Sequence, residues 1–217
     1  MKTLLCLSFL MPLAVGAQAV MQSIAPAAPA ARPVFSCRHA LAVGGGRLHA
    51  ARLLDAQGAT LDESAQWLDG SREDDASTLR LSVQWHSRQG PLHFGRGMLN
   101  LRFLSQRPMT FGYELRLRQP GGTGLPLKVD AGPGYERPRE ATAYIWLHAL
   151  FRHAEGAPAL EWSLEHLTAD GKRWLETYLQ GVFDLAPLRA VETAMADVPA
   201  ALDHLQAEPT TRCVRLP

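Results

Sequence analysis

Three stretches of the chain alternate between apolar and polar residues, at residues 78–86, 99–104 and 110–118. A period of two puts alternate side chains on opposite faces, so each stretch predicts a β-strand with one buried and one wet face. Strands of this kind are typical of antiparallel sheets that are packed on one side only. The wet positions of these three strands include Arg80, Arg102, Arg116 and Arg118.

More strands are predicted on both sides of this central segment. Residues 34–43 form a first strand that the glycines at 44–46 interrupt, and residues 47–54 either return as its hairpin partner or form a helix. Residues 125–129 allow one short strand. Residues 141–152 are apolar on both faces, which predicts a central strand buried on both sides, although periodicity alone also permits a helix.

A late hairpin is predicted around the dipeptide Asp170-Gly171. Residues 160–167 alternate again, and for residues 173–185 the pattern favours a strand over a helix. A tight turn at this dipeptide sets Leu164 opposite Thr177 and Trp162 opposite Leu179.

Helical spacing appears in two places. Thr60 and Glu63 match a capping box and Gly70 suits a helix end, so a short helix is expected over residues 61–69. Apolar residues recur every three or four positions near the C-terminus, which predicts one or two helices over about residues 187–206, with Pro187 in a first turn. The sequence thus predicts a mainly β protein, an antiparallel β-sandwich of roughly seven to nine strands with a short C-terminal helical segment, forming one domain over residues 34–217.

The N-terminus has the pattern of a secretory signal peptide. Lys2 precedes an apolar run at residues 3–16, and Ala17-Gln18-Ala19 is a small-residue cleavage site, so we expect a signal peptide over residues 1–19 that is cleaved after Ala19. The run is shorter than the roughly 20 residues that a membrane span needs. The Ala/Pro-rich residues 20–33 are expected to be a tether. We therefore expect a periplasmic or secreted bacterial protein whose mature chain has no transmembrane segment.

The mature chain keeps two cysteines, Cys37 and Cys213, one near each end. In an exported protein such a pair predicts one disulfide, and the alternative is two free thiols or an intermolecular bridge.

Charge is unevenly distributed along the chain. Residues 76–140 contain ten Lys/Arg and four Asp/Glu, whereas residues 155–209 contain three and ten. The arginines at positions 80, 102, 116 and 118 therefore suggest an anion-binding sheet face. The alternative is internal neutralisation, with Glu161, Glu165 and Glu176 pairing with these arginines if their strands are neighbours.

No specific catalytic, cofactor or nucleic-acid motif is present, and no cofactor is expected. A turn at Gln89-Gly90 would pair His86 with His93, which makes these histidines weak candidates for a metal site. The carboxylates of Glu161 and Glu165 share a strand face and could act as an acid–base pair, but their surroundings predict solvent and arginines and not the apolar pocket that would raise one pKa. Stacking on nucleic acid is disfavoured because aromatic residues do not alternate with the arginines on the wet face. Among the tryptophans, positions 85, 146 and 162 are expected in the core and positions 67 and 174 on the surface.

These observations favour an exported, non-catalytic binding protein of the bacterial envelope. It would engage an anionic envelope component or another exported protein through the arginine-bearing face or through the Gly/Pro-rich loop at residues 120–134. Two alternatives remain, an envelope hydrolase acting on glycans and a structural subunit of a surface assembly.

Overall fold

The computed structural model describes the chain from residue 32 to Pro217, with internal gaps. The expected signal peptide, its cleavage site and most of the tether lie outside the described residues, as do the turns expected at Gln89-Gly90 and Asp170-Gly171. The side chains of residues 167 and 174–176 are also outside the description. The residues described are 32–70, 79–88, 92–109, 112–122, 124–133, 139–167 and 174–217.

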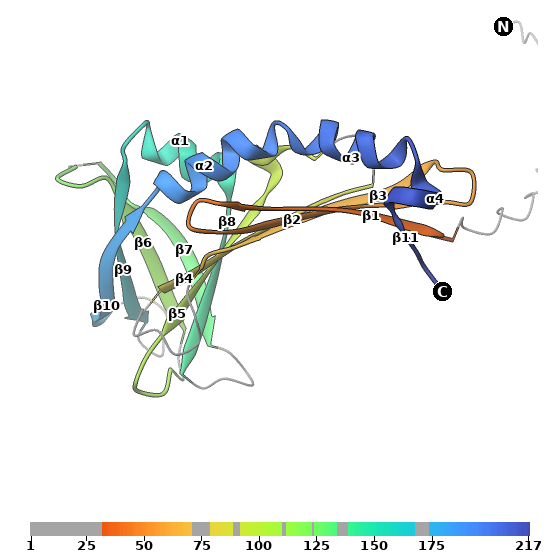
Figure 1. Cartoon of the computed structure of the whole chain (residues 1–217). Coiled ribbons are helices and arrows are strands. Elements are labelled where there is room, and N and C mark those ends of the chain that lie inside the picture. The colour runs from red at the N-terminus through yellow and green to blue at the C-terminus, as the bar shows by residue number, and fades with distance from the viewer. Residues whose placement is uncertain are drawn as a thin grey trace, which may run out of the picture. The chain divides into compact units, whose positions relative to one another are not determined.

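In this part of the chain, eleven strands form one antiparallel sheet (Figure 1). The spatial order is β10-β9-β6-β7-β8-β5-β4-β3-β2-β1-β11. The strands are β1 (Phe35–Val43), β2 (Gly46–Leu54), β3 (Thr60–Leu68), β4 (Leu79–Ser87), β5 (Met98–Leu104), β6 (Tyr113–Arg118), β7 (Leu127–Pro133), β8 (Glu140–Trp146), β9 (Ala159–Leu167), β10 (Trp174–Asp184) and β11 (Val214–Arg215).

One face of this sheet is buried across its central strands, and we call it the inner face. The residues Leu48, Trp67, Val83, Leu99 and Ile145 stand opposite one another on five adjacent strands, and all five are buried. Each of their chain neighbours points to the opposite, outer face, because side chains alternate along a strand. The alternation seen in the three central stretches therefore extends to β2, β3 and β8.

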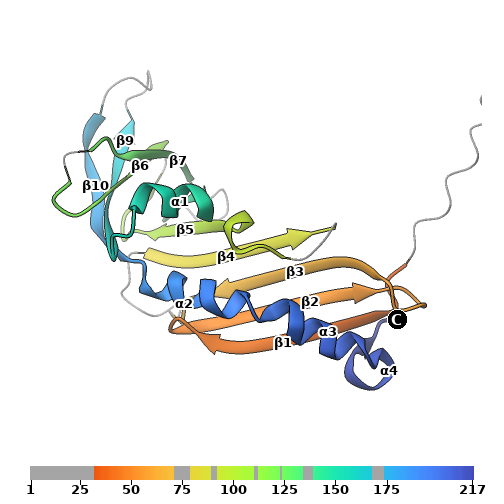
Figure 2. The same cartoon turned by 90° about the horizontal axis from the view of Figure 1, so that it is seen from above.

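Helices cover the inner face. They are α1 (Leu147–Ala154), α2 (Ala186–Met195), α3 (Val198–Gln206) and α4 (Pro209–Arg212), and a short 3-10 helix, η1, spans Phe94–Arg96. Strands β1–β3 form a nearly flat platform, and α2 and α3 run across it (Figure 2). The other strands turn away from the platform and curl (Figure 1). None of the helices in the described part is long and apolar enough to span a membrane.

The predicted class is confirmed: the chain is mainly β and antiparallel, with helices near residues 187–206. Pro187 and Pro199 occupy the first turns of α2 and α3. The sheet has eleven strands in the described part of the chain, more than the roughly seven to nine expected. The two strands that the sequence did not predict are β3 and β11. Cys37 and Cys213, the expected pair, form a disulfide with Cα atoms 4.3 Å apart, which fastens the C-terminal tail to β1.

The helix expected at residues 61–69 is wrong, because this segment is strand β3. Its buried residues, Glu63, Ala65 and Trp67, follow a period of two. Pairing with β2 and β4 on both sides gives every inner position a packed environment, which outweighs the local capping signal. Trp67, expected at the surface, is fully buried and donates its indole N–H to the Val43 carbonyl at 3.0 Å.

The single strand expected at residues 141–152 is also wrong. Strand β8 ends at Trp146, and α1 begins at Leu147, whose backbone N–H donates to the Gly97 carbonyl at 2.9 Å. Leu147, Leu150 and Ala154 are buried on one side of this helix. The apolar residues of β8 therefore do not all face protein: Trp146, expected in the core, lies on the outer face and is exposed.

The late hairpin is confirmed as two strands, but its expected register is wrong. Leu164 stands opposite Leu179, and Trp162 stands opposite Gly181. Register shifts between Trp174 and Leu179 account for the two-residue difference. At position 181 a Cβ atom would lie 2.9 Å from the Trp162 indole nitrogen, so glycine is needed there.

A buried charge network joins the platform to α3. The side chains of Arg52 and Glu63 are each 6% exposed, and Arg52 Nε donates to Glu63 Oε1 at 2.6 Å. Arg52 Nη1 also donates to Asp203 Oδ1 on α3 at 2.6 Å. The second Glu63 oxygen accepts the Leu92 backbone N–H at 3.2 Å. Two charges are thus removed from water and satisfied by each other and by their neighbours.

Replacing Glu63 by Ala is expected to lower the free energy of unfolding by about 3–5 kcal/mol, because the buried Arg52 would lose its buried partner and keep only the exposed carboxylate of Asp203. Replacing Asp203 by Asn is expected to cost less than about 1 kcal/mol, because the Asp203 side chain is 69% exposed and its ion pair is screened by water. Urea unfolding of both variants measures the difference. Similar small losses in both would show that the buried pair does not stabilise the platform.

The inner face ends, at Tyr113, in a cluster of rings. The Tyr113 ring centroid lies 5.3 Å from that of Tyr178 and 5.5 Å from that of His166. Burial, and secondarily the charge of an ionised Tyr178, raises the pKa of the Tyr113 phenol above its ordinary value of 10.0.

A raised pKa in the folded state means that the protonated phenol is favoured by folding. This contribution to stability is complete below pH 10.0 and is lost as the pH rises through the folded-state pKa. We expect Tyr113→Phe to reduce the alkaline loss of stability, measured by urea unfolding between about pH 8 and pH 11. Tyr144→Phe, at an exposed tyrosine, is the matched control; an unchanged alkaline profile in Tyr113→Phe would contradict the assignment.

Candidate functional site

An open groove of about 580 Å³ lies on the outer face of β1–β4. Small residues, Ala40, Ala51 and Ser64, form its floor. Larger polar side chains surround them, so the groove offers hydrogen-bonding groups around a shallow centre. These rim residues are Arg38, His49, Gln66, Gln84 and His86.

Strand register explains why these residues meet. Arg38, Ala51, Ser64 and His86 stand opposite one another across four strands. Ala40, His49, Gln66 and Gln84 form the neighbouring row. Directly opposed residues have Cβ atoms about 4.5–5.5 Å apart, so the two rows make one continuous surface about 14 Å wide from β1 to β4. The small side chains in the middle of the rows leave the hollow.

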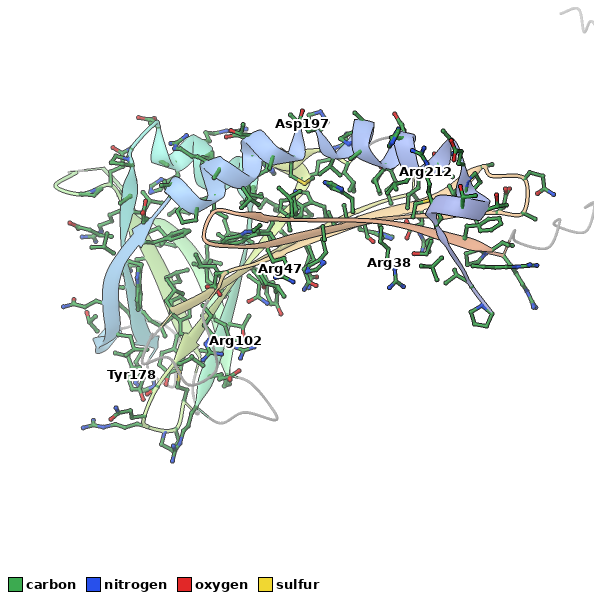
Figure 3. The ribbon with its side chains drawn as sticks, in the orientation of Figure 1. Arg38, Arg47, Arg102, Tyr178, Asp197 and Arg212 are labelled. Atoms are coloured by element: carbon green, nitrogen blue, oxygen red, sulfur yellow. A yellow bond between two sulfur atoms is a disulfide. The ribbon has the colours of Figure 1, made fainter. Side chains whose placement is uncertain are left out.

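Arginines make this surface cationic. Arg38 and Arg47 both point away from the helices, beneath the platform (Figure 3). Within the described part of the chain, neither has a carboxylate at ion-pair distance; Arg38 Nε donates only to Ser36 Oγ, at 3.3 Å. His86 Nε2 lies 3.2 Å from Asp62 Oδ1, so one acidic side chain is also present. The free guanidinium groups are suited to bind carboxylate or phosphate groups from outside.

The four arginines selected from the sequence do not form one patch. Arg80 and Arg102 stand directly opposite each other on β4 and β5, beside the groove. Arg102 also pairs with Glu140 on β8, with 3.3 Å between Nε and Oε2. The other two, Arg116 and Arg118, lie on β6, which β8 and β7 separate from β5.

Internal neutralisation, the alternative interpretation, describes Arg116 well. Its Nε lies 2.9 Å from Glu114 Oε1, and its Nη1 lies 3.1 Å from Glu165 Oε2 on β9. Arg118 is exposed and stands opposite Glu161. Arg116 is thus the least available of the four for an external anion.

The expected pairing of His86 with His93 does not occur in the described residues. His86 stands opposite Ser64 of β3, whereas His93 directly precedes η1 and is exposed. Trp85 and Phe94 are nevertheless close, because the Trp85 indole N–H donates to the Phe94 carbonyl at 2.9 Å. No group of three or more His, Cys, Asp or Glu side chains in the described residues is arranged to hold a metal ion.

The candidate acid–base pair is also separated. Glu161 and Glu165 lie four residues apart on β9, a spacing of about 13 Å along a strand. Paired carboxylates in glycoside hydrolysis lie within about 10 Å of each other. Glu165 is further engaged by Arg116. These two residues therefore do not form a hydrolytic pair.

Sequence reasoning missed the groove because it assigned β3 to a helix. The alternation of Arg38, Ala40 and Ala42 in β1, and of Arg47, His49 and Ala51 in β2, is visible in the sequence. Without a strand at residues 60–68, nothing linked these positions to Gln84 and His86. The groove became visible only when β3 joined the two hairpin strands to β4.

Comparison with models of protein families, with curated proteins and with solved structures found no match to this chain. Its functional assignment therefore depends on the chemistry of the groove and of the surface around it.

Proposed function

We propose that this chain is an exported binding protein that holds an anionic component of the bacterial envelope in the groove on the outer face of β1–β4. One observation carries the proposal: two arginines without carboxylate partners in the described chain, Arg38 and Arg47, line or flank an open groove of about 580 Å³. Arg80 and Arg102 extend the same cationic surface onto the next strands.

The form of the groove favours an extended ligand over a small ion. Its cations are spread over several strands and do not converge on one point, and its floor is open. Guanidinium groups at such spacing match a polymer or a large headgroup with repeated anionic groups. Imidazole and amide side chains between the arginines add hydrogen bonds that do not depend on charge.

An exported location is supported by the signal-peptide pattern at residues 1–19 and is compatible with the Cys37–Cys213 disulfide, because disulfides persist in oxidising compartments. A structural subunit is less well supported. Strand β10 lies at an edge of the sheet, but its register shifts bend it, which discourages pairing with another chain.

Export is tested by expressing the full chain in a bacterium and determining the N-terminal residue of the protein in the periplasmic fraction and in the medium. We expect a mature chain that begins at Val20, because cleavage is predicted after Ala19. An uncleaved chain confined to the cytoplasm would contradict the proposed location.

Anion binding is tested with the double variant Arg38→Ser, Arg47→Ser. We expect at least about tenfold weaker binding to polyanions, because each charge-assisted hydrogen bond contributes about 1.5–3 kcal/mol. Isothermal titration calorimetry at low and high salt, with polyglutamate, polyphosphate and lipopolysaccharide as probes, measures the loss.

Arg152→Ser is the matched control, because this arginine is exposed on α1, away from the outer face of the sheet. Added salt is expected to weaken wild-type binding, since the contacts are exposed to solvent. The proposal is wrong if the wild-type protein binds none of the probes at low salt, or if the double variant behaves like Arg152→Ser.

A further inference from the structure

Two aromatic side chains on the outer face of the sheet have no role in the core. Tyr144 is 59% exposed and Trp146 is 48% exposed; both pair with β5, and they lie beyond the β8 residues 141–143 that pair with β7. They occupy alternate positions of one strand, so their Cα atoms lie about 7 Å apart and their side chains leave the same face. Two large aromatic side chains that are exposed side by side form an apolar patch of the kind that marks binding sites.

Cross-strand rows connect these aromatic residues to the groove. Trp146 stands opposite Met98, which stands opposite Gln84, and the row continues to Gln66 and His49. Tyr144 begins a parallel row that passes through Asn100, Ser82 and Leu68 and ends at Arg47.

The rows run from β8 to β2, four strand spacings or about 19 Å measured along the sheet, which bends between β8 and the platform (Figure 1). Arg47 and Arg102 lie on the same side of the sheet, beneath the platform (Figure 3). Aromatic, amide and cationic groups thus share one continuous outer surface.

The Trp146 indole is held in place before any ligand arrives. Its ring stacks on His148, with ring centroids 6.3 Å apart and an interplanar angle of 29°. His148 Nδ1 is in turn 3.1 Å from the Gly95 carbonyl oxygen. A ring that is already oriented loses less conformational entropy on binding, so this pair is preorganised for stacking.

We propose that Tyr144 and Trp146 stack on sugar rings and that the ligand of the outer face is a polysaccharide whose units carry carboxylate groups. Aromatic faces pack against the C–H groups of a pyranose, and the planar amides of Asn100, Gln84 and Gln66 hydrogen-bond its hydroxyl groups. The arginines at the groove then bind the carboxylates. This inference rests on the proposed function, because it names the class of anion that the groove binds.

Single-stranded nucleic acid is the other polymer that stacks on aromatic side chains and is anionic. Tyr144 and Trp146 share the outer face with Arg102, although they lie on β8 and do not alternate with the arginines of the three central stretches. However, Asp62 and Glu140 lie on this face beside His86 and Arg102. They would repel a continuous phosphate backbone, whereas a polysaccharide with spaced carboxylates and neutral hydroxyl groups accommodates them.

The test compares a uronic acid oligosaccharide with polyglutamate of the same number of carboxylates, using the mature full-length chain. We expect the wild type to bind the oligosaccharide more tightly. Trp146→Ala and Tyr144→Ala are each expected to weaken oligosaccharide binding about tenfold and to leave polyglutamate binding unchanged. Val182→Ala, at an exposed apolar residue of β10, is the matched control.

Tryptophan fluorescence gives a second readout. The indoles of Trp67, Trp85 and Trp162 are buried, so among the tryptophan side chains described a sugar ring can reach Trp146. We expect the oligosaccharide to change the emission of the wild type and this change to be lost in Trp146→Phe, while folding, checked by circular dichroism, is retained.

The outcomes separate the two proposals. If oligosaccharide and polyglutamate bind equally well and neither aromatic substitution matters, the groove binds anions but the polysaccharide assignment is wrong. If neither of these probes nor polyphosphate nor lipopolysaccharide binds the wild type, the proposed function itself fails. If single-stranded DNA binds more tightly than the oligosaccharide and loses affinity in Trp146→Ala, nucleic acid replaces polysaccharide and the inference is overturned.

Discussion

The dry inner face of the sheet is the constraint on which the rest of this structure depends. Buried residues on five adjacent strands, with Val83 at the centre, stand opposite one another and fix the register of the strands. A slip by one residue would move a whole strand's apolar set into water, so the register is strongly specified. The same register places the chain neighbours of these residues, including Gln84, His49 and Trp146, in rows on the outer face. The candidate site is thus a consequence of how the core packs.

The apolar face of a single sheet must be buried by other elements, and on the platform the C-terminal helices bury it. Helices α2 and α3 bury Leu188, Val191 and Leu202 against this region, and the Cys37–Cys213 disulfide fastens the tail to β1. The Arg52–Glu63 pair adds directional bonds to contacts that are otherwise apolar. Because these elements all act on the inner face, the outer face of the platform stays open. The groove lies where nothing in the described chain covers the sheet.

The sequence predicted those elements whose local pattern agreed with their tertiary environment. Strands β4, β5 and β9 have regular alternation and one wet face, and they form as expected. The assignment failed at β3, because its capping box favours a helix whereas its alternating residues favour a strand. Pairing with β2 and β4 on both sides decides in favour of the strand. It failed again at β8, because exposed Tyr144 and Trp146 cannot be distinguished from core residues by hydrophobicity alone. Strand order, which separates Arg102 from Arg116, depends on long-range pairing that no local pattern encodes.

The arrangement of charge on the outer face bears on what the surface selects. Arg102 has Glu140 beside it and His86 has Asp62, whereas Arg38 and Arg47 have no such partner in the described chain. A surface of this composition favours a ligand with separated anionic groups over a uniformly charged polymer. Some of the anionic groups of such a polymer would lie against Asp62 and Glu140 and be repelled. The aromatic pair on β8 lies at the other end of the same rows, about 19 Å from β2 measured along the sheet. In the proposed function, affinity and selectivity come from different ends of one surface: the arginines attract the anionic groups of the ligand, and the preorganised indole of Trp146 selects a ligand with a ring that can stack on it.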